Sequence, residues 1–466
     1  MSFFDSLDKY SDNVAIIQKE TEQINYKNLL EQADEIGNQT PARALVFMLC
    51  SNTIESVAAY LGFLRAKSVP VLINHIINKE LLLNLLDVYK PEYIYLPKTH
   101  ARLCESFSLV ASYGKYSLLK TSCNIDYSIH ENVAQLLMTS GTTGSPKLVK
   151  QTYRNISSNA SSIAKYLNIK CDDRPITTMP MSYSYGLSIL NSHFIRGAAI
   201  ILTEATVMDR VFWELARTNN ASTFGGVPYI YEILKKLRFG NMEINSLKYL
   251  TQAGGRLSVN LVSEFADICS EKGIAFYVMY GQTEATARMS YLPYECIKEK
   301  QGSIGVAIPD GNLMLMDSNQ NLILDEHVVG QLIYEGENVS MGYAENRFDL
   351  KLGDKNNGKL YTGDLAKRDA DGYYYIAGRM KRFVKVYGNR VNLDELEGLI
   401  RSAGYNCACT GSDDNLKIYI TQSQDEEQIE SHIMKYTGIN RAGFSFVAIG
   451  NIPRNSSGKI QYSLLN

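Results

Sequence analysis

The sequence carries almost no excess charge of either sign. Its 466 residues include 47 basic and 49 acidic side chains, which gives a formal net charge of −2. A nearly neutral chain has no bulk attraction to nucleic acid or to an anionic membrane surface, so we expect neither as a partner. Charged groups must therefore act locally, within a site.

Cysteine and histidine are too sparse and too scattered to predict a metal centre. Of the eight cysteines, Cys407 and Cys409 lie close in sequence, but the partners that a zinc site needs do not accompany them. The six histidines include no pair at a spacing of four residues. We therefore expect reduced, mostly buried thiols and no histidine-built metal site.

Long apolar runs are missing as well. No stretch approaches the roughly 20 apolar residues that cross a bilayer. The N-terminal "MSFFDSLDKYSDN" lacks the cationic start and the apolar core of a secretion signal. The sequence thus predicts a cytoplasmic protein without a membrane span. Repeats and disordered tracts are absent too, so a chain of this length is expected to form two or three packed lobes.

Helical and strand patterns alternate over the first 240 residues. "TIESVAAYLGFLRAKS" places Ile54, Val57, Ala58, Leu61 and Leu64 on one helical face and precedes the short apolar run "VPVLIN". "KELLLNLLDVYKP" then predicts a helix and "EYIYLP" a strand. Repeated βα units of this kind favour an α/β fold with a parallel sheet covered by helices.

The pattern changes twice further along the chain. From about 300 to 378, short glycine-punctuated strands such as "GQLIYEGENVSMGY" predict a small antiparallel or barrel-like β subdomain. From 381 onward, a helix at "LDELEGLIRSAG" and a strand at "LKIYITQS" predict a small α+β domain. The predicted organisation is a large N-terminal domain over residues 1–380 and a C-terminal domain over residues 381–466.

The segment "MTSGTTGSPKLVKQT", residues 138–152, has two interpretations. Clusters of Ser, Thr and Gly are common in surface linkers. Alternatively, glycines let backbone N–H groups turn inward, hydroxyls add donors and Lys147 adds positive charge, which together make a phosphate cradle. The spacing is not that of the usual P-loop. These residues alone leave both interpretations open.

Three further segments carry groups suited to nucleotide chemistry, each with a structural alternative. In "MYGQTEATARM", Thr283 can donate to a phosphate oxygen and Glu284 can hold Mg²⁺, or Glu284 can cap a following helix. In "LYTGDLAKRDADGYYYIAGRMKR", Asp364 can accept from ribose hydroxyls and Arg379 can reach sugar or phosphate, or both can belong to a solvated hairpin. Lys459 in "IPRNSSGKIQYSLLN" is either functional or an exposed C-terminal lysine.

Five segments occur together and in a familiar order: "LLMTSGTTGSPKLV", "YGQTEA", "YTGDL", "IAGRMKRFVKVYGNRV" and "PRNSSGKI". This set resembles the signature of the adenylate-forming superfamily of AMP-binding enzymes, which includes acyl- and aryl-CoA synthetases, nonribosomal peptide synthetase adenylation domains and luciferases. The resemblance runs from about residue 13 to the C-terminus. It implies an enzyme that uses ATP and Mg²⁺ to convert a carboxylic acid to an acyl-adenylate, releases pyrophosphate, and transfers the acyl group to a thiol.

The resemblance also implies a role for each motif. Lys459, Thr283 and Glu284 would be catalytic; Thr283 would contact the α-phosphate, Glu284 would hold Mg²⁺, and Lys459 would bridge the acid and the α-phosphate. The β- and γ-phosphates would be bound by Thr139, Ser140, Gly141, Thr142, Thr143, Gly144 and Lys147. Adenine and ribose would be bound by Gly254, Gly255, Arg256, Tyr280, Gly281, Gln282, Asp364, Ile376 and Arg379, with Tyr280 beside the adenine.

The same resemblance implies that the C-terminal domain moves about a hinge at Lys381. One orientation would bring Lys459 to the adenylate, and the other would present Gly388, which would line a tunnel for a pantetheine thiol. Coenzyme A is the expected acceptor, and the phosphopantetheine of an acyl carrier protein is the alternative. The chain shows no insertion like that of fatty acyl-AMP ligases, which favours thioester formation.

By family position, the acyl pocket would be lined by Tyr183, Tyr185, Phe224, Gly225, Gly226 and Met279. Ser182 and Tyr183 stand where many acyl-CoA synthetases have an aromatic residue and a histidine, so gating by that histidine is in question. Residues 176–202 contain no acidic side chain to pair with an ammonium group, so an acyl or aryl acid is expected rather than an α-amino acid. Arg256 can recognise a second carboxylate or face solvent.

Two other classes of protein fit the sequence less well. A catalytically inactive ATP-binding scaffold on the same fold would be expected to lose Lys459, Glu284 or Asp364, and all three are present. An oxidoreductase or a kinase is disfavoured because no dinucleotide fingerprint follows an early strand and no kinase motif set occurs.

Overall fold

The computed structural model describes residues 3–19, 22–100, 106–123, 128–138, 147–380, 382–386, 389–412, 415–437, 440–455 and 458–465. Its largest sheet has a parallel centre and antiparallel edges. The central strands are β3 (Leu45–Cys50), β4 (Val69–Asn74), β5 (Tyr93–Pro97) and β8 (Val133–Met138). The edge strands are β6 (Ser108–Tyr113), β7 (Tyr116–Lys120), β9 (Leu148–Thr152) and β18 (Tyr343–Ala344), which gives the order β18-β9-β8-β4-β3-β5-β7-β6.

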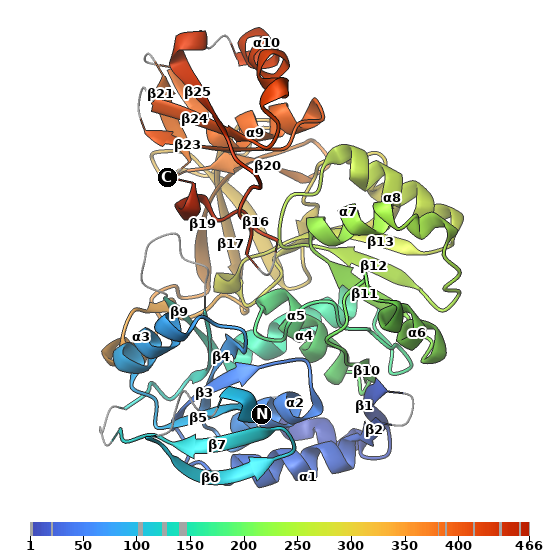
Figure 1. Cartoon of the computed structure of the whole chain (residues 1–466), viewed down its shortest axis with the longest axis vertical. Coiled ribbons are helices and arrows are strands. Elements are labelled where there is room, and N and C mark those ends of the chain that lie inside the picture. Colours follow the sequence, from blue (N-terminus) through green and yellow to red (C-terminus); the bar gives the residue numbers. More distant parts are fainter. Residues whose placement is uncertain are drawn as a thin grey trace.

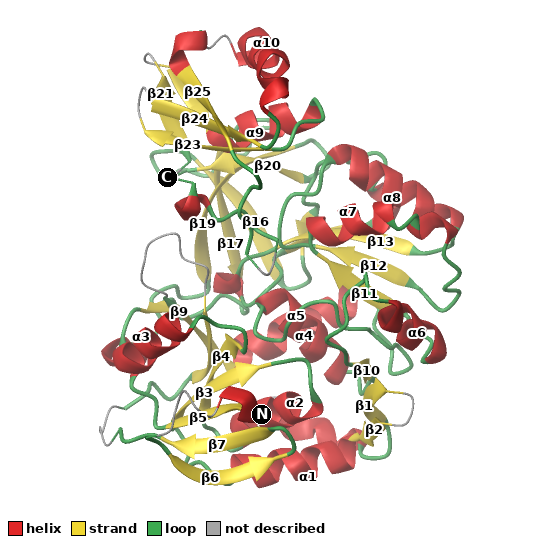
Figure 2. Ribbon diagram, in the orientation of Figure 1, coloured by secondary structure: helices red, strands yellow, loops and turns green. Residues whose placement is uncertain are grey.

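Helices cover both faces of this sheet, as Figure 2 shows in red against the yellow strands. One hydrophobic core contains Val46 and Met48 of β3, and the core on the other face contains Phe47 and Leu49, because side chains alternate along a strand. The first core takes in α1 (Tyr26–Gly37), α2 (Ile54–Arg65), α4 (Tyr153–Tyr166) and α5 (Ser184–Phe194); the second takes in α3 (Lys79–Tyr89). The predicted helix at α2 is buried from Ser56 to Leu64 rather than on one face, since it packs against both α1 and β4.

Several helices begin where a polar side chain caps their first turn. The Thr53 hydroxyl accepts a hydrogen bond from the backbone N–H of Ser56 at the start of α2. At the start of α4, Thr152 and Asn155 exchange side-chain and backbone hydrogen bonds in a capping box. Each such cap contributes about 1 kcal/mol to helix stability. Since Thr152 is also the last residue of β9, the cap fixes the angle at which the chain leaves the sheet.

A second sheet carries three parallel strands, β11 (Thr223–Gly226), β12 (Tyr249–Gln252) and β13 (Ala275–Tyr280), followed by the antiparallel β14 (Ser290–Leu292) and β15 (Val306–Ala307). Its helices are α6 (Arg210–Thr218), α7 (Pro228–Lys236) and α8 (Val259–Glu271). A small sheet of β10 (Ile200–Ile201), β1 (Val14–Lys19) and β2 (Glu22–Asn25) lies between the first sheet with its helices and the second sheet with its helices. The alternation of helix and strand predicted for the first 240 residues is present up to β5 and again from α4, whereas the described residues from β5 to β9 form five consecutive strands without a helix.

The glycine-punctuated region forms a four-stranded antiparallel sheet. Its strands are β16 (Gly311–Met316), β17 (Gly330–Gly336), β19 (Lys359–Arg368) and β20 (Tyr374–Arg379), in the order β16-β17-β19-β20. The predicted antiparallel pairing is therefore present, in an open sheet with β16 and β20 at its edges. Figure 1 places this sheet between the lower layers and the upper lobe.

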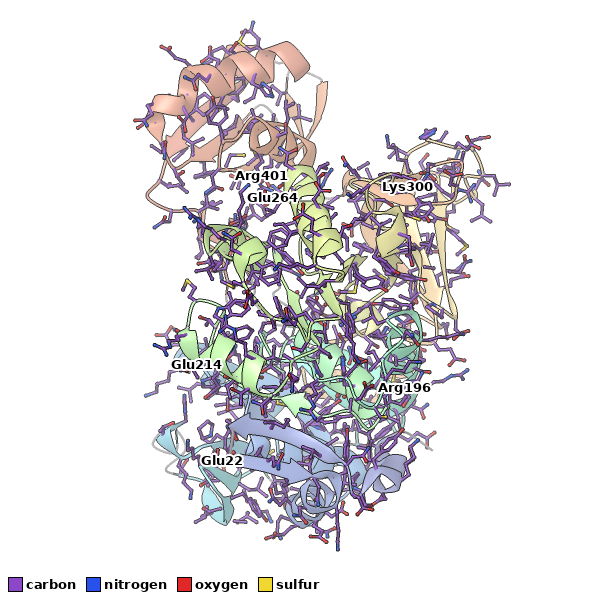
Figure 3. All side chains as sticks on the ribbon, turned by 90° about the vertical axis from the view of Figure 1, so that its right-hand side faces the viewer. Glu22, Arg196, Glu214, Glu264, Lys300 and Arg401 are labelled. Atoms are coloured by element: carbon purple, nitrogen blue, oxygen red, sulfur yellow. The ribbon has the colours of Figure 1, made fainter. Side chains whose placement is uncertain are left out.

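The upper lobe in Figure 1 is a small α+β unit. It contains the hairpin β21 (Phe383–Val386) and β22 (Asn389–Asn392), the sheet of β23 (Cys407–Ser412), β24 (Asn415–Ile420) and β25 (Phe444–Ala448), and the helices α9 (Leu393–Ser402) and α10 (Glu426–Thr437). In the side-on view of Figure 3, Arg401 is labelled near the base of this lobe and Glu22 near the other end of the molecule. The boundary between residues 380 and 381 stays a prediction, because Lys381 lies outside the described residues.

Short 3-10 segments join these elements: η1 (Phe3–Tyr10), η3 (Phe239–Asn241), η4 (Thr283–Ala285), η5 (Tyr294–Cys296), η6 (Arg347–Lys351), η7 (Ser423–Asp425), η8 (Arg441–Gly443) and η9 (Tyr462–Leu464). No helix in the part of the chain that the structure describes has the length and apolar character needed to cross a membrane.

Candidate active site

Three parallel strands of the second sheet end side by side. Gly226 at the end of β11 pairs with Gln252 of β12, which pairs in turn with Val278 of β13. The carboxyl ends of parallel strands form the edge at which α/β sheets bind ligands. Tyr280 is the last residue of β13, and Gly254 and Thr283 lie in the segments beyond this edge, so the sheet topology brings together residues that the sequence predicted for separate parts of one site.

Asp364 collects hydrogen bonds from two parts of the chain. Its Oδ2 accepts from the Tyr280 hydroxyl at 2.5 Å and from Gln282 Nε2 at 2.9 Å, while Arg379 Nε lies 3.2 Å from Oδ1. Asp364 and Arg379 face each other directly in the β19–β20 ladder. Burial and the Asp364 carboxylate hold the pKa of the Tyr280 phenol well above its usual value, so Tyr280 stays a donor. The result is a fixed carboxylate acceptor that suits hydroxyl donors such as those of a ribose.

A tight turn after β13 presents the next two predicted residues. Glycine is required at position 281, because a Cβ there would lie 1.8 Å from the carbonyl oxygen of Ala287. Thr283 Oγ1 lies 3.1 Å from Ser184 Oγ, and the Thr283 carbonyl accepts from Gln151 Nε2 at 3.0 Å. Thr283 is therefore held between α5 and β9. The three-residue η4 follows instead of an α-helix, so the alternative role of Glu284 as a helix cap is not observed.

The edge strand β18 contacts both charged residues predicted for the phosphates and the metal. The Tyr343 hydroxyl donates to Glu284 Oε1 at 2.5 Å, and Lys147 Nζ lies 2.5 Å from Oε1 of Glu345, which directly follows β18. Tyr343 pairs with Val149 of β9, two residues after Lys147. The register between β9 and β18 therefore brings Lys147 and Glu284 to the same side of the site.

The donor set around Glu284 fits a nucleotide-bound Mg²⁺. The described ranges contain no group of three or more His, Cys, Asp or Glu side chains that would hold a metal by protein ligands alone. Mg²⁺ is commonly bound by one or two carboxylates, with phosphate and water oxygens completing its shell. Glu284 supplies one such carboxylate, in a position fixed by the phenol of Tyr343.

Lys459 reaches this site from the tail of the C-terminal lobe. A tight turn presents it: Asn455 Oδ1 accepts from the Lys459 N–H at 2.9 Å, and the Lys459 carbonyl accepts from the Asn455 N–H at 2.9 Å. The ammonium lies 5.8 Å from the ring centre of Tyr183. Lys459 is exposed as a whole residue, yet desolvation around its ammonium lowers its pKa. The charge of Arg379 adds to that effect, and Glu284 and Asp364 oppose it. The ammonium of Lys459 is therefore close enough to Arg379, Glu284 and Asp364, all predicted to bind nucleotide or Mg²⁺, for their charges to shift its pKa.

Most residues predicted for the acyl pocket lie together. Tyr183 and Tyr185 make an edge-to-face pair with ring centres 6.4 Å apart, and Tyr185 shares a buried cluster with Met279. A Cβ on Gly225 would lie 2.7 Å from the Tyr185 hydroxyl, so this side of β11 adjoins the two tyrosines. Gly226, the next residue, ends the same strand but faces the other side, because a Cβ on it would lie 2.9 Å from the Tyr231 ring.

Phe224 was predicted to line the same pocket, but the structure places it elsewhere. It packs with Phe212, Trp213 and Phe239 in the core beneath the second sheet. The reason is strand alternation: neighbouring residues of β11 point to opposite faces, so Phe224 and Gly225 do not share a face.

The other predicted residues are distributed around this centre. Gly254 adjoins Tyr183, since a Cβ on Gly254 would lie 2.6 Å from the Tyr183 hydroxyl. Gly255 and Arg256 are exposed, in keeping with the solvent-facing alternative for Arg256. Ile376 packs on the core of the antiparallel sheet. Thr139, Ser140, Gly141, Thr142, Thr143, Gly144, Lys381 and Gly388 lie outside the described residues.

Residues that no sequence motif predicted also contact the predicted ones, among them Ser184, Arg288, Tyr343 and Glu345. Tyr343 and Glu345 become partners of Glu284 and Lys147 only through the pairing of β18 with β9. Arg288 carried a usable signal, since it lies three residues after "YGQTEA" as a charged residue among Ala, Thr and Met.

The candidate site contains residues of two lobes, and the smaller lobe supplies Lys459, as predicted from the resemblance to adenylate-forming enzymes. The chain belongs to the AMP-binding enzyme family, whose sequence model matches residues 3–344.

The chain is similar to two curated ligases. It is 27% identical over 346 residues to the sulfoacetate–CoA ligase of Cupriavidus necator, covering 72% of this chain and 67% of that protein. It is 27% identical over 350 residues to the 2-succinylbenzoate–CoA ligase of Bacillus pumilus, covering 72% of this chain and 69% of that protein. The predicted enzyme class, an AMP-forming acid–CoA ligase, is therefore confirmed. A structure of the o-succinylbenzoate CoA synthetase of Bacillus subtilis, which is 20% identical to this chain, contains ATP and a magnesium ion.

Solved structures establish the fold over the whole chain. The o-succinylbenzoate CoA synthetase of Bacillus subtilis with its acyl-adenylate intermediate matches with a TM-score of 0.80 at 20% identity, covering 100% of this chain and 97% of that chain. The anthranilate CoA ligase AuaEII with anthranoyl-AMP gives a TM-score of 0.80 at 20% identity, covering 100% and 96%. The predicted fold class is thus confirmed. These relatives support a small-molecule acid as partner and give no support for an acyl carrier protein.

Proposed function

We propose that the residues gathered at this edge carry out acid activation as predicted from the sequence, and that the acid is a small acyl or aryl carboxylate rather than an α-amino acid. One observation carries the proposal: the ammonium of Lys459, from the C-terminal tail, lies against Tyr183 within the field of Glu284, Asp364 and Arg379. The Lys459 ammonium thus lies between the predicted acyl pocket and the residues predicted to bind the nucleotide.

In the first half-reaction, a carboxylate oxygen of the acid forms a bond to the α-phosphorus of ATP, and the bond from that phosphorus to the bridging oxygen breaks. Pyrophosphate leaves with the electron pair. Two anions must approach each other, so the main task of the protein is to neutralise and align charge. Lys459 would stand between the acid and the α-phosphate, Thr283 would donate to the α-phosphate, and Asp364 would accept from the ribose.

Glu284 and Lys147 would serve the departing phosphates. Mg²⁺ held by Glu284 would neutralise triphosphate charge when it is bound. Lys147 would exchange its ion pair with Glu345 for a phosphate oxygen, which a lysine on a flexible stem can do. The Ser/Thr/Gly segment before Lys147 would complete the grip, as predicted.

In the second half-reaction, the thiolate sulfur of coenzyme A would attack the acyl carbonyl carbon, the bond to AMP would break, and AMP would leave. We propose that the C-terminal lobe turns about Lys381 for this step and presents Gly388 to the pantetheine arm. Coenzyme A is the preferred acceptor, and the cytoplasm stays the expected location.

The proposal is tested by separating the half-reactions in Lys459→Ala. We expect hydroxamate-trapped acyl-adenylate to fall on the order of 100-fold or more, as for removal of a transition-state charge partner. Thiolysis of supplied acyl-adenylate by coenzyme A should change only a few-fold. Lys236→Ala, an exposed lysine on α7, is the matched control and should leave both steps unchanged.

Two results would count against this function. Equal loss of both half-reactions in Lys459→Ala would remove that residue from its assigned step. A wild-type protein that binds ATP but releases no pyrophosphate with any of a panel of aryl, short, medium and long-chain acids would contradict acid activation itself.

A further inference from the structure

Arg288 is a buried cation beside the predicted acyl pocket. The residue is 2% exposed and lies between η4 and β14. Its Nε donates to Ser188 Oγ at 3.2 Å, and its Nη1 donates to the Tyr166 hydroxyl at 3.1 Å and to Met279 Sδ at 3.3 Å. The guanidinium carbon lies 5.1 Å from the ring centre of Tyr185. Two of these neighbours, Tyr185 and Met279, are residues predicted to line the acyl pocket.

The groups around Arg288 are neutral. Its contacts are a serine hydroxyl, a thioether and two phenols, and burial raises the pKa of Tyr166 and Tyr185, so that both phenols stay uncharged. No carboxylate contacts Arg288 in the described ranges, and its Nη2 makes no hydrogen bond there. Buried charges in proteins are normally paired, because an unpaired one is costly to desolvate. The guanidinium is therefore short of an anionic partner.

The position of Arg288 indicates where such a partner would come from. Lys459 lies against Tyr183, Arg288 lies against Tyr185, and the two rings are 6.4 Å apart. A molecule lying along these two rings would meet a cation at each. One cation is assigned to the reacting carboxylate, so the other is available to a second anion on the same molecule.

We propose that the acid substrate carries a second anionic group, a carboxylate or a sulfonate, and that Arg288 binds it. This inference rests on the proposed function of the site. The planar guanidinium, with a donor left over on Nη2, suits an oxyanion with two or more acceptor oxygens. The same charge disfavours an acid with an ammonium at that position, in line with the absence of acidic residues from 176–202.

Matched acid pairs test the proposal. Pyrophosphate release is measured for succinate against butyrate, glutarate against valerate, isophthalate against 3-methylbenzoate, and 3-sulfopropanoate against valerate. We expect wild type to prefer at least one acid with a second anionic group over its partner by on the order of 100-fold in kcat/KM, the effect of an oriented buried ion pair. In Arg288→Met that preference should collapse to within a few-fold.

Two controls separate recognition from folding. Arg288→Lys keeps the charge but not the fork of donors, so it should retain part of the preference. Arg196→Met removes an exposed arginine two residues after α5, labelled in Figure 3, and should leave the preference intact. Thermal melting should show Arg288→Met folded, with unchanged or raised Tm, since it removes an unpaired buried charge.

Each outcome decides one claim. If the acids of a pair lose activity equally in Arg288→Met, the residue is structural and the inference is overturned. If wild type turns over only monoacids, the inference also fails while acid activation stands. If no acid of any kind releases pyrophosphate, the failure belongs to the proposed function.

Discussion

His193 lies in the core with both ring nitrogens in hydrogen bonds. Nδ1 is 2.8 Å from the carbonyl oxygen of Ile189, and Nε2 is 3.1 Å from the Tyr249 hydroxyl. Burial lowers the pKa of His193 to about 4, against the opposing effects of the Ile189 carbonyl and Asp173. The folded protein therefore holds a neutral imidazole at a pH where the unfolded chain takes up a proton.

That difference makes folding sensitive to mild acid. The unfolded pKa is about 6.5, so between pH 6.5 and 4 the unfolded state binds more protons and stability falls as the pH falls. The loss reaches about 2 kcal/mol at pH 5 relative to pH 8. We expect His193→Gln to lose less stability than wild type between pH 7.5 and pH 5, measured by urea unfolding.

The control for this prediction is His327→Asn, which changes an exposed histidine. It should keep the wild-type dependence on pH. Identical pH dependence in wild type and His193→Gln would show that His193 does not set the acid sensitivity.

Tyr343 gives a second prediction for a single residue. Its hydroxyl donates to Glu284, the carboxylate proposed to hold Mg²⁺, so Tyr343→Phe removes the bond that orients it. Removing such an orienting partner typically weakens metal binding by about 10-fold or more. We expect the Mg²⁺ concentration for half-maximal pyrophosphate release to rise by about 10-fold.

Tyr361→Phe is the matched change, because that tyrosine is 51% exposed on β19. It should leave the Mg²⁺ requirement unaltered. An unchanged Mg²⁺ requirement in Tyr343→Phe, with a lower rate at saturating Mg²⁺, would mean that the phenol acts on something other than the metal.

At this scale, the sequence identified residues by local motif and missed those defined by contact. Glu284, Asp364 and Lys459 stand in recognisable segments. Tyr343 has no such context, because its role arises from the register of β18 on β9. Arg288 stands beside a motif, but only its burial without an acidic partner makes it notable.

Among the elements, α9 anchors the lobe that carries Lys459. Glu397 on this helix is 2% exposed and accepts from Arg382 Nη2 at 2.8 Å, from Arg401 Nη2 at 2.7 Å and from the Cys409 N–H at 2.7 Å. The hydroxyl of Tyr462, three residues after Lys459, donates to the same carboxylate at 2.9 Å. One buried carboxylate thus joins α9, β23, the start of the lobe and its tail.

Glu397→Gln is expected to loosen these four connections together. Removing one partner from a buried charge cluster costs about 3 to 5 kcal/mol, because the remaining cations lose their counter-charge. We expect hydrogen exchange in α9 and β23 to increase, and adenylate formation to fall as the tail loses its anchor. Hydrogen exchange in the first sheet should stay at the wild-type rate.

The matched control is Glu427→Gln on α10, an exposed residue of the same lobe. If Glu397→Gln left exchange throughout the lobe unchanged, the cluster would not stabilise the tail. The sequence predicted α9 from its helical pattern, but it did not predict the cluster, whose members come from positions 382 to 462.

Across the whole molecule, the C-terminal lobe docks in a defined orientation. A Cβ on Gly458 would lie 3.4 Å from the Cβ of Tyr229 on α7, close to the spacing of about 3.5 to 4.5 Å in a disulfide. The pair therefore offers a way to lock the lobe. Gly458 has a φ of +77°, so cysteine there costs about 1 kcal/mol in backbone strain.

We expect oxidised Tyr229→Cys/Gly458→Cys protein to keep forming acyl-adenylate and to stop forming the thioester. Reduction with dithiothreitol should restore thioester formation. Tyr229→Cys alone, treated with the same oxidant, controls for the native cysteines. If the oxidised protein formed thioester as fast as the same protein after reduction, the lobe would not need to turn.

The overall architecture was the most predictable part, because the changes in hydrophobic pattern at about 300 and 381 match changes in sheet type. The orientation of the lobes could not be predicted from the sequence. It depends on contacts such as that between Gly458 and α7, which no local pattern encodes. The placement of Phe224 failed at a smaller scale for a related reason, since the motif gave its position but not the face of its strand.

The long separation between Lys147 and Lys459 has a consequence for the order of synthesis. A ribosome translates Lys459 more than 300 residues after Lys147, and after the larger lobe. Under the proposed mechanism, a nascent chain contains nucleotide-binding residues such as Lys147 before it contains Lys459, which adenylate formation requires. An incomplete chain would therefore not convert ATP to an acyl-adenylate that it cannot transfer to a thiol. The order of translation would thus prevent incomplete chains from consuming ATP.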